Sequence, residues 1–301
     1  MMDSFGGPEK LHIREVPAPH AGAGQLRVHV TAAGLNPMDW VMTANDEAGA
    51  RFGLSLPTGF GTDYAGVVDE VGDDVTDFKV GDRVFGCALS RSVADYVVVI
   101  PRGKIGDGAH HTPDGVDDKT AATLDIAART ASAALAAIEP GDGDTVLIGG
   151  AAGGVGVFAI QLARLAGAKV IGTASESSFA YLRSLGAEPV TYGEGLAERV
   201  RAIAPGGITA ATDLYGTETV DAARELGVPD DRISTIAARV RGVTAVSGEH
   251  AAPGTLEHVA ELVATGQLMV PIAATYPVEQ IRQAVEFQAG RHAHGKVVVT
   301  L

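Results

Sequence analysis

Cysteine is almost absent from this sequence. Among 301 residues there is a single thiol, that of Cys87. One thiol excludes a disulfide within the chain, and it also excludes a zinc lobe built from several cysteines. Such scarcity of cysteine is typical of a reducing compartment, so we expect a cytoplasmic protein.

Basic charge and long apolar runs are scarce as well. The first residues read "MMDSFGGPEKLHIREV", which has no apolar core of signal-peptide length, and no later stretch approaches a membrane span. Lys and Arg number 23 against 37 Asp and Glu, which gives a formal charge of −14. A phosphate backbone attracts clustered Lys and Arg. We therefore expect no membrane and no nucleic-acid partner, and we expect a small molecule instead.

Hydrophobic residues, in contrast, are plentiful. They make up 46% of the chain, and 301 residues are enough for two domains that each bury a core. Up to about residue 120, short apolar or alternating runs between Gly, Pro and Asp predict strands. These runs cover residues 10–16, 25–34, 64–72, 82–88 and 95–100.

The residue composition changes at Lys119, where an alanine-rich stretch predicts a helix that stops at Pro140 and Gly141. Beyond it, predicted strands alternate with helices, which is typical of a parallel sheet with helices on both faces. These strands cover residues 145–150, 168–175, 188–192, 208–216 and 232–238. After about residue 265 the pattern changes again, to a strand at 268–277, a helix at 278–287 and a strand at 296–301.

A turn rich in small residues, "GGAAGGVG", lies between the predicted strand at 145–150 and the helix that follows it. In the dinucleotide fingerprint, three small positions allow a tight turn, a close approach to pyrophosphate and close helix packing. A purely structural turn is the alternative, but the strand–turn–helix context favours a nucleotide site. Its predicted cofactor-binding residues are Ala151, Ala152, Gly153, Gly154, Val155 and Gly156.

The second strand of this unit ends at Ala174, where an NAD site usually has an acid that binds the ribose 2′-hydroxyl. A carboxylate there would repel a 2′-phosphate, so its absence favours NADPH over NADH. Ser175, Ser177 and Ser178 offer hydroxyl donors to such a phosphate, and we include Ser175 and Ser178 among the cofactor-binding residues. Two alternatives stay open: Glu176 serves a ribose, or the serines only cap a helix.

Five segments, in the expected order, resemble the medium-chain dehydrogenase/reductase superfamily, and most of all its zinc-independent quinone oxidoreductase branch. They are "AAGLNPMDW" (32–40), "GTDYAGVVDEVGDDVTDFKVGDRVFG" (61–86), "LDIAARTASAAL" (124–135), "GGAAGGVG" (149–156) and "GRHAHGKVVVTL" (290–301). The resemblance implies an α/β protein with a GroES-like β-barrel domain at residues 1–120, completed by 265–301. It also implies a Rossmann doubly wound parallel-sheet domain at 121–264, and a homodimer.

The zinc alcohol dehydrogenases of that superfamily differ at their metal ligands. Where they have a cysteine ligand this chain has Asn36, and where they have a histidine ligand it has Thr62. Zinc prefers thiolate, imidazole and carboxylate ligands, so we expect no metal. Without a Lewis acid, hydride transfer to an electron-poor substrate is the easier chemistry, because negative charge spreads onto a conjugated oxygen.

The resemblance therefore implies an NADPH-dependent enzyme that reduces a quinone or an α,β-unsaturated carbonyl, including the substrate of a freestanding enoyl reductase. The alternative is a non-catalytic NADPH-binding protein with a structural or regulatory role, since relatives of this fold can serve in that way.

Four residues are candidates for catalysis. The resemblance places Asn36 against the nicotinamide ribose or the substrate, and Thr130 near the nicotinamide carboxamide. Asp39 is predicted to orient its neighbours, and Tyr64 to donate a proton or hydrogen bond to substrate oxygen. Structural alternatives apply to three of them: Asn36 as a turn asparagine, Thr130 as a hydroxyl bonded within its helix, and Tyr64 as a tyrosine packed in a strand.

The resemblance places Tyr192 beside the adenosine phosphate, and an aromatic that only ends a strand is its alternative. Tyr215, Ile236 and Ala237 are predicted as further cofactor contacts because this type of sheet binds ligands at the carboxyl ends of its strands. Trp40 and Phe52 are interpreted as walls of the substrate pocket, or alternatively as core residues. Residues 41–56 and 239–250 are expected to be pocket-lining loops. Lys296 matches the family's tail segment, and a cap on the last strand is its other interpretation.

Overall fold

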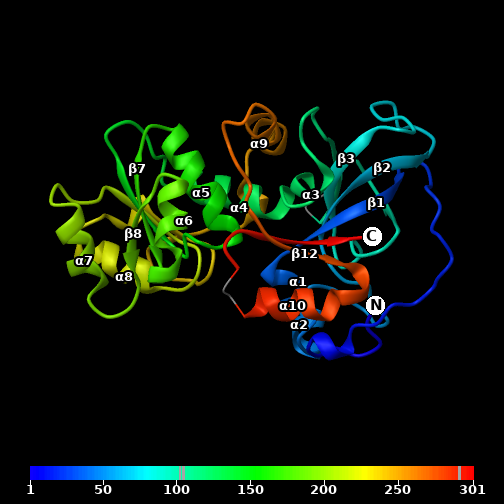
Figure 1. Cartoon of the computed structure of the whole chain (residues 1–301), viewed down its shortest axis with the longest axis horizontal. Coiled ribbons are helices and arrows are strands. Elements are labelled where there is room, and N and C mark those ends of the chain that lie inside the picture. The colour runs from blue at the N-terminus through cyan, green and yellow to red at the C-terminus, as the bar shows by residue number, and fades with distance from the viewer. Residues whose placement is uncertain (102, 104–105, 291–292) are drawn as a thin grey trace. The chain divides into compact units, whose positions relative to one another are not determined.

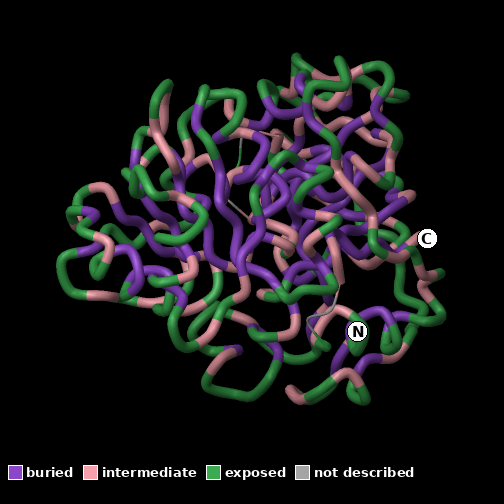
Figure 2. Tube along the Cα trace, turned by 60° about the vertical axis from the view of Figure 1, so that its left-hand side comes forward, coloured by how far each residue is buried: buried purple, intermediate pink, exposed green. Residues whose placement is uncertain are grey.

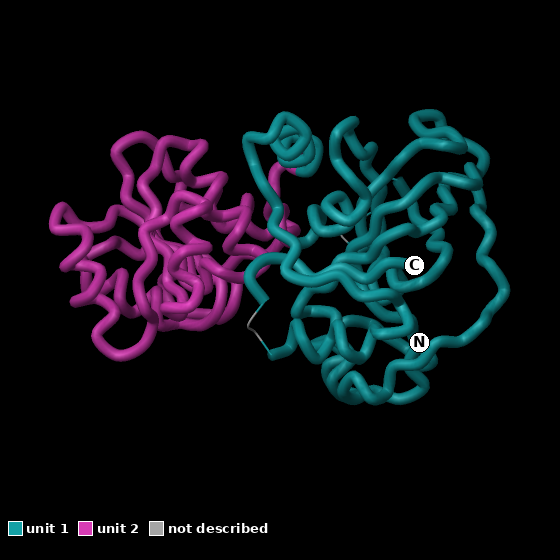
Figure 3. Tube along the Cα trace, in the orientation of Figure 1, with its two compact units in different colours: residues 1–126, 256–301 teal, residues 127–255 magenta. Residues whose placement is uncertain are grey.

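The computed structural model describes residues 1–101, 103, 106–290 and 293–301, which form two compact units (Figure 3). Unit 1 comprises residues 1–126 and 256–301, and unit 2 comprises residues 127–255. The sequence placed these boundaries at 120/121 and 264/265. The helix α9 (Thr255–Ala264) is therefore assigned to unit 1 except for its first residue.

The described residues of unit 1 build a seven-stranded sheet in the order β12-β13-β1-β2-β3-β5, with β4 paired to β1. The last strand of the chain pairs antiparallel with β1, so the tail completes the N-terminal sheet as the resemblance implied. The strands are β1 (Leu26–Leu35), β2 (Asp63–Val71), β3 (Arg83–Ala88), β4 (Tyr96–Val99), β5 (Asp107–His111), β12 (Ile272–Pro277) and β13 (Lys296–Thr300).

Helices pack on this sheet and close its core. In Figure 1, α10 lies beside α1, and it packs against β12, β13 and α1. The core beneath it gathers Leu35, Phe60, Ile281, Val285 and Val297. The helices here are η1 (Pro8–Lys10), α1 (Pro37–Met42), α2 (Asp46–Arg51), α3 (Asp118–Ala121), α4 (Asp125–Ala136, which continues into unit 2), η5 (Val278–Gln280) and α10 (Ile281–Ala289).

Three predictions of local structure were wrong. Residues 10–16 form no strand: Leu11 is buried, but Ile13 and Val16 are 61% and 58% exposed, so their apolar pattern meets no partner strand. Residues 41–56 and 239–250 are not continuous loops: the first contain α2, and the second contain β11 (Thr244–Ala245) and η4 (Gly248–His250). The Asn45 side chain caps α2 by accepting a hydrogen bond from the Ala48 N–H at 2.9 Å.

Unit 2 is a parallel sheet in the order β11-β10-β9-β6-β7-β8. The chain runs outward from β6 in both directions, which is the Rossmann order and confirms the predicted doubly wound fold. The strands are β6 (Thr145–Gly149), β7 (Lys169–Ala174), β8 (Glu188–Thr191), β9 (Ala210–Asp213), β10 (Ile233–Thr235) and β11 (Thr244–Ala245).

Helices of unit 2 bury the apolar faces of its strands. Buried segments lie mostly in the interior of the molecule, with exposed segments around them (Figure 2). The central core of unit 2 includes Leu147, Ile171, Val200, Val220 and Ile233. The helices are α5 (Gly154–Leu165), η2 (Glu176–Ser178), α6 (Phe179–Ser184), α7 (Leu196–Ile203), α8 (Glu218–Glu225), η3 (Asp230–Arg232) and η4 (Gly248–His250).

The contact between β1 and β2 gives a stability prediction. A Cβ at Gly66 of β2 would lie 2.0 Å from the backbone oxygen of His29, beside a register shift in β1. We expect Gly66→Ala to lower the free energy of unfolding by about 3 kcal/mol through overpacking, measured by urea denaturation. The control is Gly206→Ala, where nothing lies within 4 Å of the added carbon. Equal denaturation midpoints for both variants would contradict the packing argument.

Candidate functional site

The first part of the site forms where β1 ends and α1 begins. Asn36 is the N-cap of α1 with an extended backbone, and Pro37 follows at a position that suits its fixed φ and missing N–H. The backbone N–H of Asn36 donates to Asp39 Oδ2 at 2.7 Å, and the hydroxyl of Thr62 donates to Asp39 Oδ1 at 2.6 Å. Asp39 therefore holds the start of the helix through both of its carboxylate oxygens.

The side-chain amide of Asn36 is held from both sides. Lys296 Nζ donates to Asn36 Oδ1 at 2.7 Å, and Asn36 Nδ2 donates to Asp63 Oδ2 at 2.9 Å. Asp63 Oδ1 accepts from the Ile126 N–H at 3.2 Å, and Lys296 Nζ lies 3.9 Å from Asp63 Oδ2. The five residues of this network are at most 3% exposed, and we name them the Asn36 cluster: Asn36, Asp39, Thr62, Asp63 and Lys296.

Burial dominates the electrostatics of the cluster. It raises the pKa of Asp39 to about 6, although the hydrogen bonds from Thr62 and the Asn36 N–H oppose the shift. Burial also raises the pKa of Asp63, opposed by the Lys296 ammonium, and it lowers the pKa of Lys296. Both oxygens of Asp63 accept hydrogen bonds from N–H groups, an arrangement that suits the ionised carboxylate facing a charged lysine.

Tyr64 does not join this cluster. Its side chain is fully buried in the core of the sheet, and its hydroxyl donates to the backbone oxygen of Gly108 at 2.8 Å. Burial raises the pKa of this phenol well above its usual value, which makes proton release harder. The packing alternative therefore describes Tyr64, and its expected role as a proton donor gains no support.

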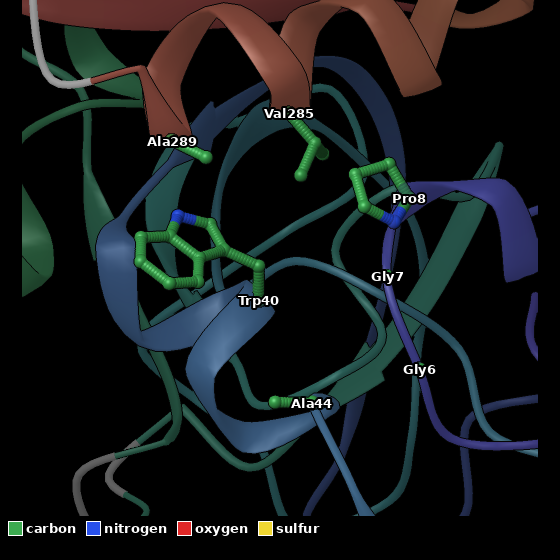
Figure 4. Close-up of a pocket in the computed structure, with 7 residues that line it drawn as sticks. All are labelled: Gly6, Gly7, Pro8, Trp40, Ala44, Val285 and Ala289. Carbon is green, nitrogen blue, oxygen red and sulfur yellow. The ribbon is translucent and has the colours of Figure 1, made fainter.

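Trp40 lines a different, apolar pocket (Figure 4). Its indole N–H donates to Gln288 Oε1 at 3.0 Å, which ties α1 to α10. The pocket is lined by Gly6, Gly7, Pro8, Trp40, Ala44, Val285 and Ala289. Phe52, which is 38% exposed at the end of α2, is not among the lining residues, so the structure does not bring the two predicted wall residues together there.

In unit 2, the glycine-rich turn follows β6 and leads into α5. Gly150 has a left-handed backbone with a φ of +68°, and its N–H donates to the hydroxyl of Thr173 on β7 at 3.1 Å. A Cβ at Gly156 would lie 2.3 Å from the Ala151 backbone oxygen, so only glycine allows this close packing. Gly153 is the N-cap of α5 and has no side chain that could accept a hydrogen bond from the first amides of the helix.

The remaining predicted cofactor residues follow strand ends. The register pairs Ala174 with Thr191, and Asp213 with both Gly149 and Thr235. The carboxyl ends of these parallel strands therefore form one edge of the sheet. Just beyond it come Ser175, Ser178, Tyr192, Tyr215, Ile236 and Ala237. Tyr192 and Tyr215 are 59% and 65% exposed, which is available surface for a ligand.

The serines after β7 share hydrogen bonds. Ser175 Oγ lies 3.0 Å from Ser177 Oγ and 3.1 Å from Ser178 Oγ. No side chain caps η2 or α6 by a hydrogen bond, so the alternative in which these serines serve only as helix caps gains no support. Thr130 lies half-buried on α4.

Two residues that hold this edge were not predicted. The carboxylate of Asp213 accepts the N–H groups of Tyr215, Gly216 and Thr219 at 2.8 to 2.9 Å. The guanidinium of Arg199 donates to backbone oxygens of residues 191–194, the segment that carries Tyr192. An Asp at the end of a strand is a recognisable turn signal, whereas nothing in the sequence marks Arg199.

Comparison with known proteins shows which family has this architecture. Residues 22–111 match the model of the alcohol dehydrogenase GroES-like domain, and residues 154–286 match that of the zinc-binding dehydrogenase family. A quinone oxidoreductase of Pseudomonas aeruginosa is 36% identical over 207 residues, which is 67% of this chain and 61% of that protein. The chain belongs to the medium-chain dehydrogenase/reductase superfamily, in its quinone oxidoreductase-like branch.

Solved structures agree over the whole chain. The quinone oxidoreductase of Coxiella burnetii superposes with a TM-score of 0.85 at 28% identity, covering 100% of this chain and 98% of that one. A mycobacterial protein solved in complex with NADPH has the same TM-score at 25% identity and the same coverage. The chain spans 14% to 61% of the length of the first curated relatives it matches.

The description of the second family model implies zinc, and the Asn36 cluster does not fit that ion. It offers an amide, a hydroxyl and an ammonium beside two carboxylates, and the ammonium already contacts Asn36 Oδ1 at 2.7 Å. Elsewhere in the part of the chain that the structure describes, no three His, Cys, Asp or Glu side chains gather to hold a metal. The same part contains no helix both long and apolar enough to span a membrane.

The raised pKa of Asp39 predicts an unusual pH dependence of stability. The ordinary value is 3.8 and the folded value is about 6, so between them the native state binds the proton more tightly than the unfolded state. This contribution to stability is complete below pH 3.8 and is lost as the pH rises through 6. We therefore compare the free energies of unfolding of the wild type and of Asp39→Asn. The value for the wild type minus that for the variant should fall by about 3 kcal/mol from pH 3.8 to 7.

Urea titrations at a series of pH values measure this difference. Asp114→Asn, at an exposed position, controls for the loss of one surface charge. If the free energy of unfolding of the wild type minus that of Asp39→Asn grows with pH, Asp39 is stabilised as a carboxylate, which would contradict the argument from burial.

Proposed function

We propose that this chain is an NADPH-dependent oxidoreductase that reduces a quinone or an α,β-unsaturated carbonyl, such as an enone or enoyl group, without a metal ion. The observation that carries the proposal is the Asn36 cluster, in which a buried lysine and an asparagine stand among carboxylates and no zinc ligand set exists. The quinone oxidoreductases among the relatives and the solved structures support this class of reaction.

The turn after β6 is the proposed cradle of the cofactor pyrophosphate. Its close backbone packing at Gly156 and the uncapped start of α5 suit a phosphate group. Tyr215, Ile236 and Ala237, beyond the strand ends, are proposed to contact the rest of the cofactor, and Thr130 the nicotinamide carboxamide. When bound, NADPH supplies a hydride to the carbon of the substrate.

Asn36 is the proposed donor to the substrate oxygen that gains negative charge. A primary amide has two N–H donors, and only one of them is given to Asp63. The second can meet the developing enolate or hydroquinone oxygen and stabilise it. Asp39 keeps the backbone of Asn36 in place. Because the Tyr64 hydroxyl is bound to Gly108, we assign the final proton to water.

NADPH is the proposed form of the cofactor. Ala174 ends β7 without a carboxylate, and the three clustered serine hydroxyls that follow can donate to a 2′-phosphate, together with Tyr192. The structural neighbour solved with NADPH supports this preference. A homodimer and a small-molecule partner are predictions that accompany the proposal.

The reaction itself can be tested by following the loss of reduced cofactor in the presence of benzoquinone or a small enone. After dialysis against a chelator, we expect turnover to be unchanged. Asn36→Ala should lower kcat by roughly a hundredfold, the size typical of losing one donor to a developing oxyanion. Asp114→Ala, at an exposed position outside the predicted site, is the control.

Three outcomes would contradict parts of the proposal. Cofactor binding without turnover of any quinone or enone would favour the non-catalytic NADPH-binding protein. Activity that is lost on chelation and restored by zinc would refute a metal-free site. Full activity of Asn36→Ala would remove Asn36 from the reaction.

Cofactor preference can be tested at the end of β7. We expect Ala174→Asp to raise the KM for NADPH relative to NADH by roughly tenfold or more, because a carboxylate repels the 2′-phosphate. Ala174→Asn has nearly the same shape without the charge, and it should leave the ratio of the two KM values close to that of the wild type. A ratio that moves equally in both variants would mean that size, and not charge, sets the preference.

A further inference from the structure

Lys296 is a buried charge that the proposed reaction does not use. It is the first residue of β13, and its side chain is 2% exposed. The register of β13 against β1 pairs Leu35 with Val297, so the next antiparallel positions are Asn36 and Lys296. Two residues at opposite ends of the chain are thereby neighbours, and the lysine ammonium points at the amide of Asn36.

The lysine decides how the Asn36 amide is oriented. Its ammonium has donors only, and the ionised carboxylate of Asp63 has acceptors only. The amide therefore satisfies both neighbours in one orientation, with Oδ1 toward Lys296 and Nδ2 toward Asp63. A flipped amide would place its NH₂ group against the ammonium and its oxygen against the carboxylate. One N–H of the amide then has a fixed direction away from Asp63.

The ammonium also changes the strength of that donor. A cation bound to the oxygen of an amide draws electron density from its nitrogen, and hydrogen-bonded chains in a low-dielectric interior strengthen one another. The N–H of Asn36 thus becomes a better donor to an oxygen that gains negative charge. A neutral side chain in place of Lys296 would supply neither the polarisation nor the unique orientation.

We propose that Lys296 is a positioning residue, which locks and polarises the Asn36 amide so that its second N–H meets the oxygen acceptor of the substrate. This inference rests on the proposed function for the identity of the acceptor. In this proposal the positive charge in the Asn36 cluster is the ammonium of Lys296. The competing role is structural: Lys296 only neutralises the buried carboxylate of Asp63, which it approaches at 3.9 Å.

A double variant separates the two roles. Lys296→Met alone leaves Asp63 buried without its cation and is expected to lower the unfolding midpoint strongly. Asp63→Asn combined with Lys296→Met removes both charges together, and it is expected to keep an unfolding midpoint close to that of the wild type. If Lys296 positions Asn36, kcat of this double variant falls roughly tenfold to a hundredfold, while the KM for NADPH is unchanged.

The same double change is then made in the Asn36→Ala background. There the amide is gone, so positioning predicts a further loss in kcat of less than about twofold. Lys169→Met is the control, since Lys169 also begins a strand but is exposed. A double variant with wild-type kcat, or an equal loss of kcat with and without Asn36, would overturn the proposal.

A measurement on the wild type covers the case in which the double variant does not fold, or in which no quinone or enone is turned over. Nitrogen-15 NMR of the intact protein should show a slowly exchanging Lys296 ammonium and a slowly exchanging Asn36 side-chain amide, each assigned through its correlations with its own side-chain carbons in the wild type. Fast exchange of either group would contradict the proposal that the Lys296 ammonium holds the Asn36 amide in place. Absence of turnover together with slow exchange would refute the proposed function, but it would still support the positioning of the Asn36 amide by Lys296.

Discussion

The burial of the Lys296 ammonium beside the Asp63 carboxylate is the constraint on which unit 1 depends. Each charge alone would be very unfavourable in a core sealed from water, and their hydrogen bonds through Asn36 are what make the burial tolerable. Through Asn36, the N-cap of α1, this contact joins the tail strand β13 to the start of α1 and to the carboxylate on β2. A change in Lys296 alone or in Asp63 alone therefore affects both the packing of unit 1 and the balance of its buried charges.

The two units contribute different kinds of chemistry. Unit 2 offers backbone amides, serine hydroxyls and exposed tyrosine rings at one sheet edge, which suits a large, phosphate-bearing ligand. Unit 1 offers a small, rigid cluster of charged and amide groups, which suits one reacting oxygen. Loops in unit 2 are held by Asp213 and Arg199, so its ligand surface is also preorganised.

Most of the fold could be predicted from the sequence, since strand–turn–helix alternation and a small-residue turn are local patterns. The placement of Asn36 and Asp39 followed from a motif. The contacts of Lys296 and Asp63 with Asn36 were not predicted, because they depend on a pairing between distant segments that no local pattern reveals. Tyr64 was overestimated for a related reason: an aromatic hydroxyl in a strand looks the same in the sequence whether it faces a ligand or, as here, a backbone oxygen.

The return of the tail to the first sheet also has a consequence for synthesis on the ribosome. Unit 2 is one continuous segment and can fold as soon as it emerges, whereas β1 lacks its neighbour β13 until all of unit 2 has been made. During that interval residues 32–35 of β1 have no partner strand on the side that β13 will occupy, and Asp63 lacks the Lys296 ammonium. The incomplete sheet is then the part of the nascent chain most exposed to wrong strand pairing.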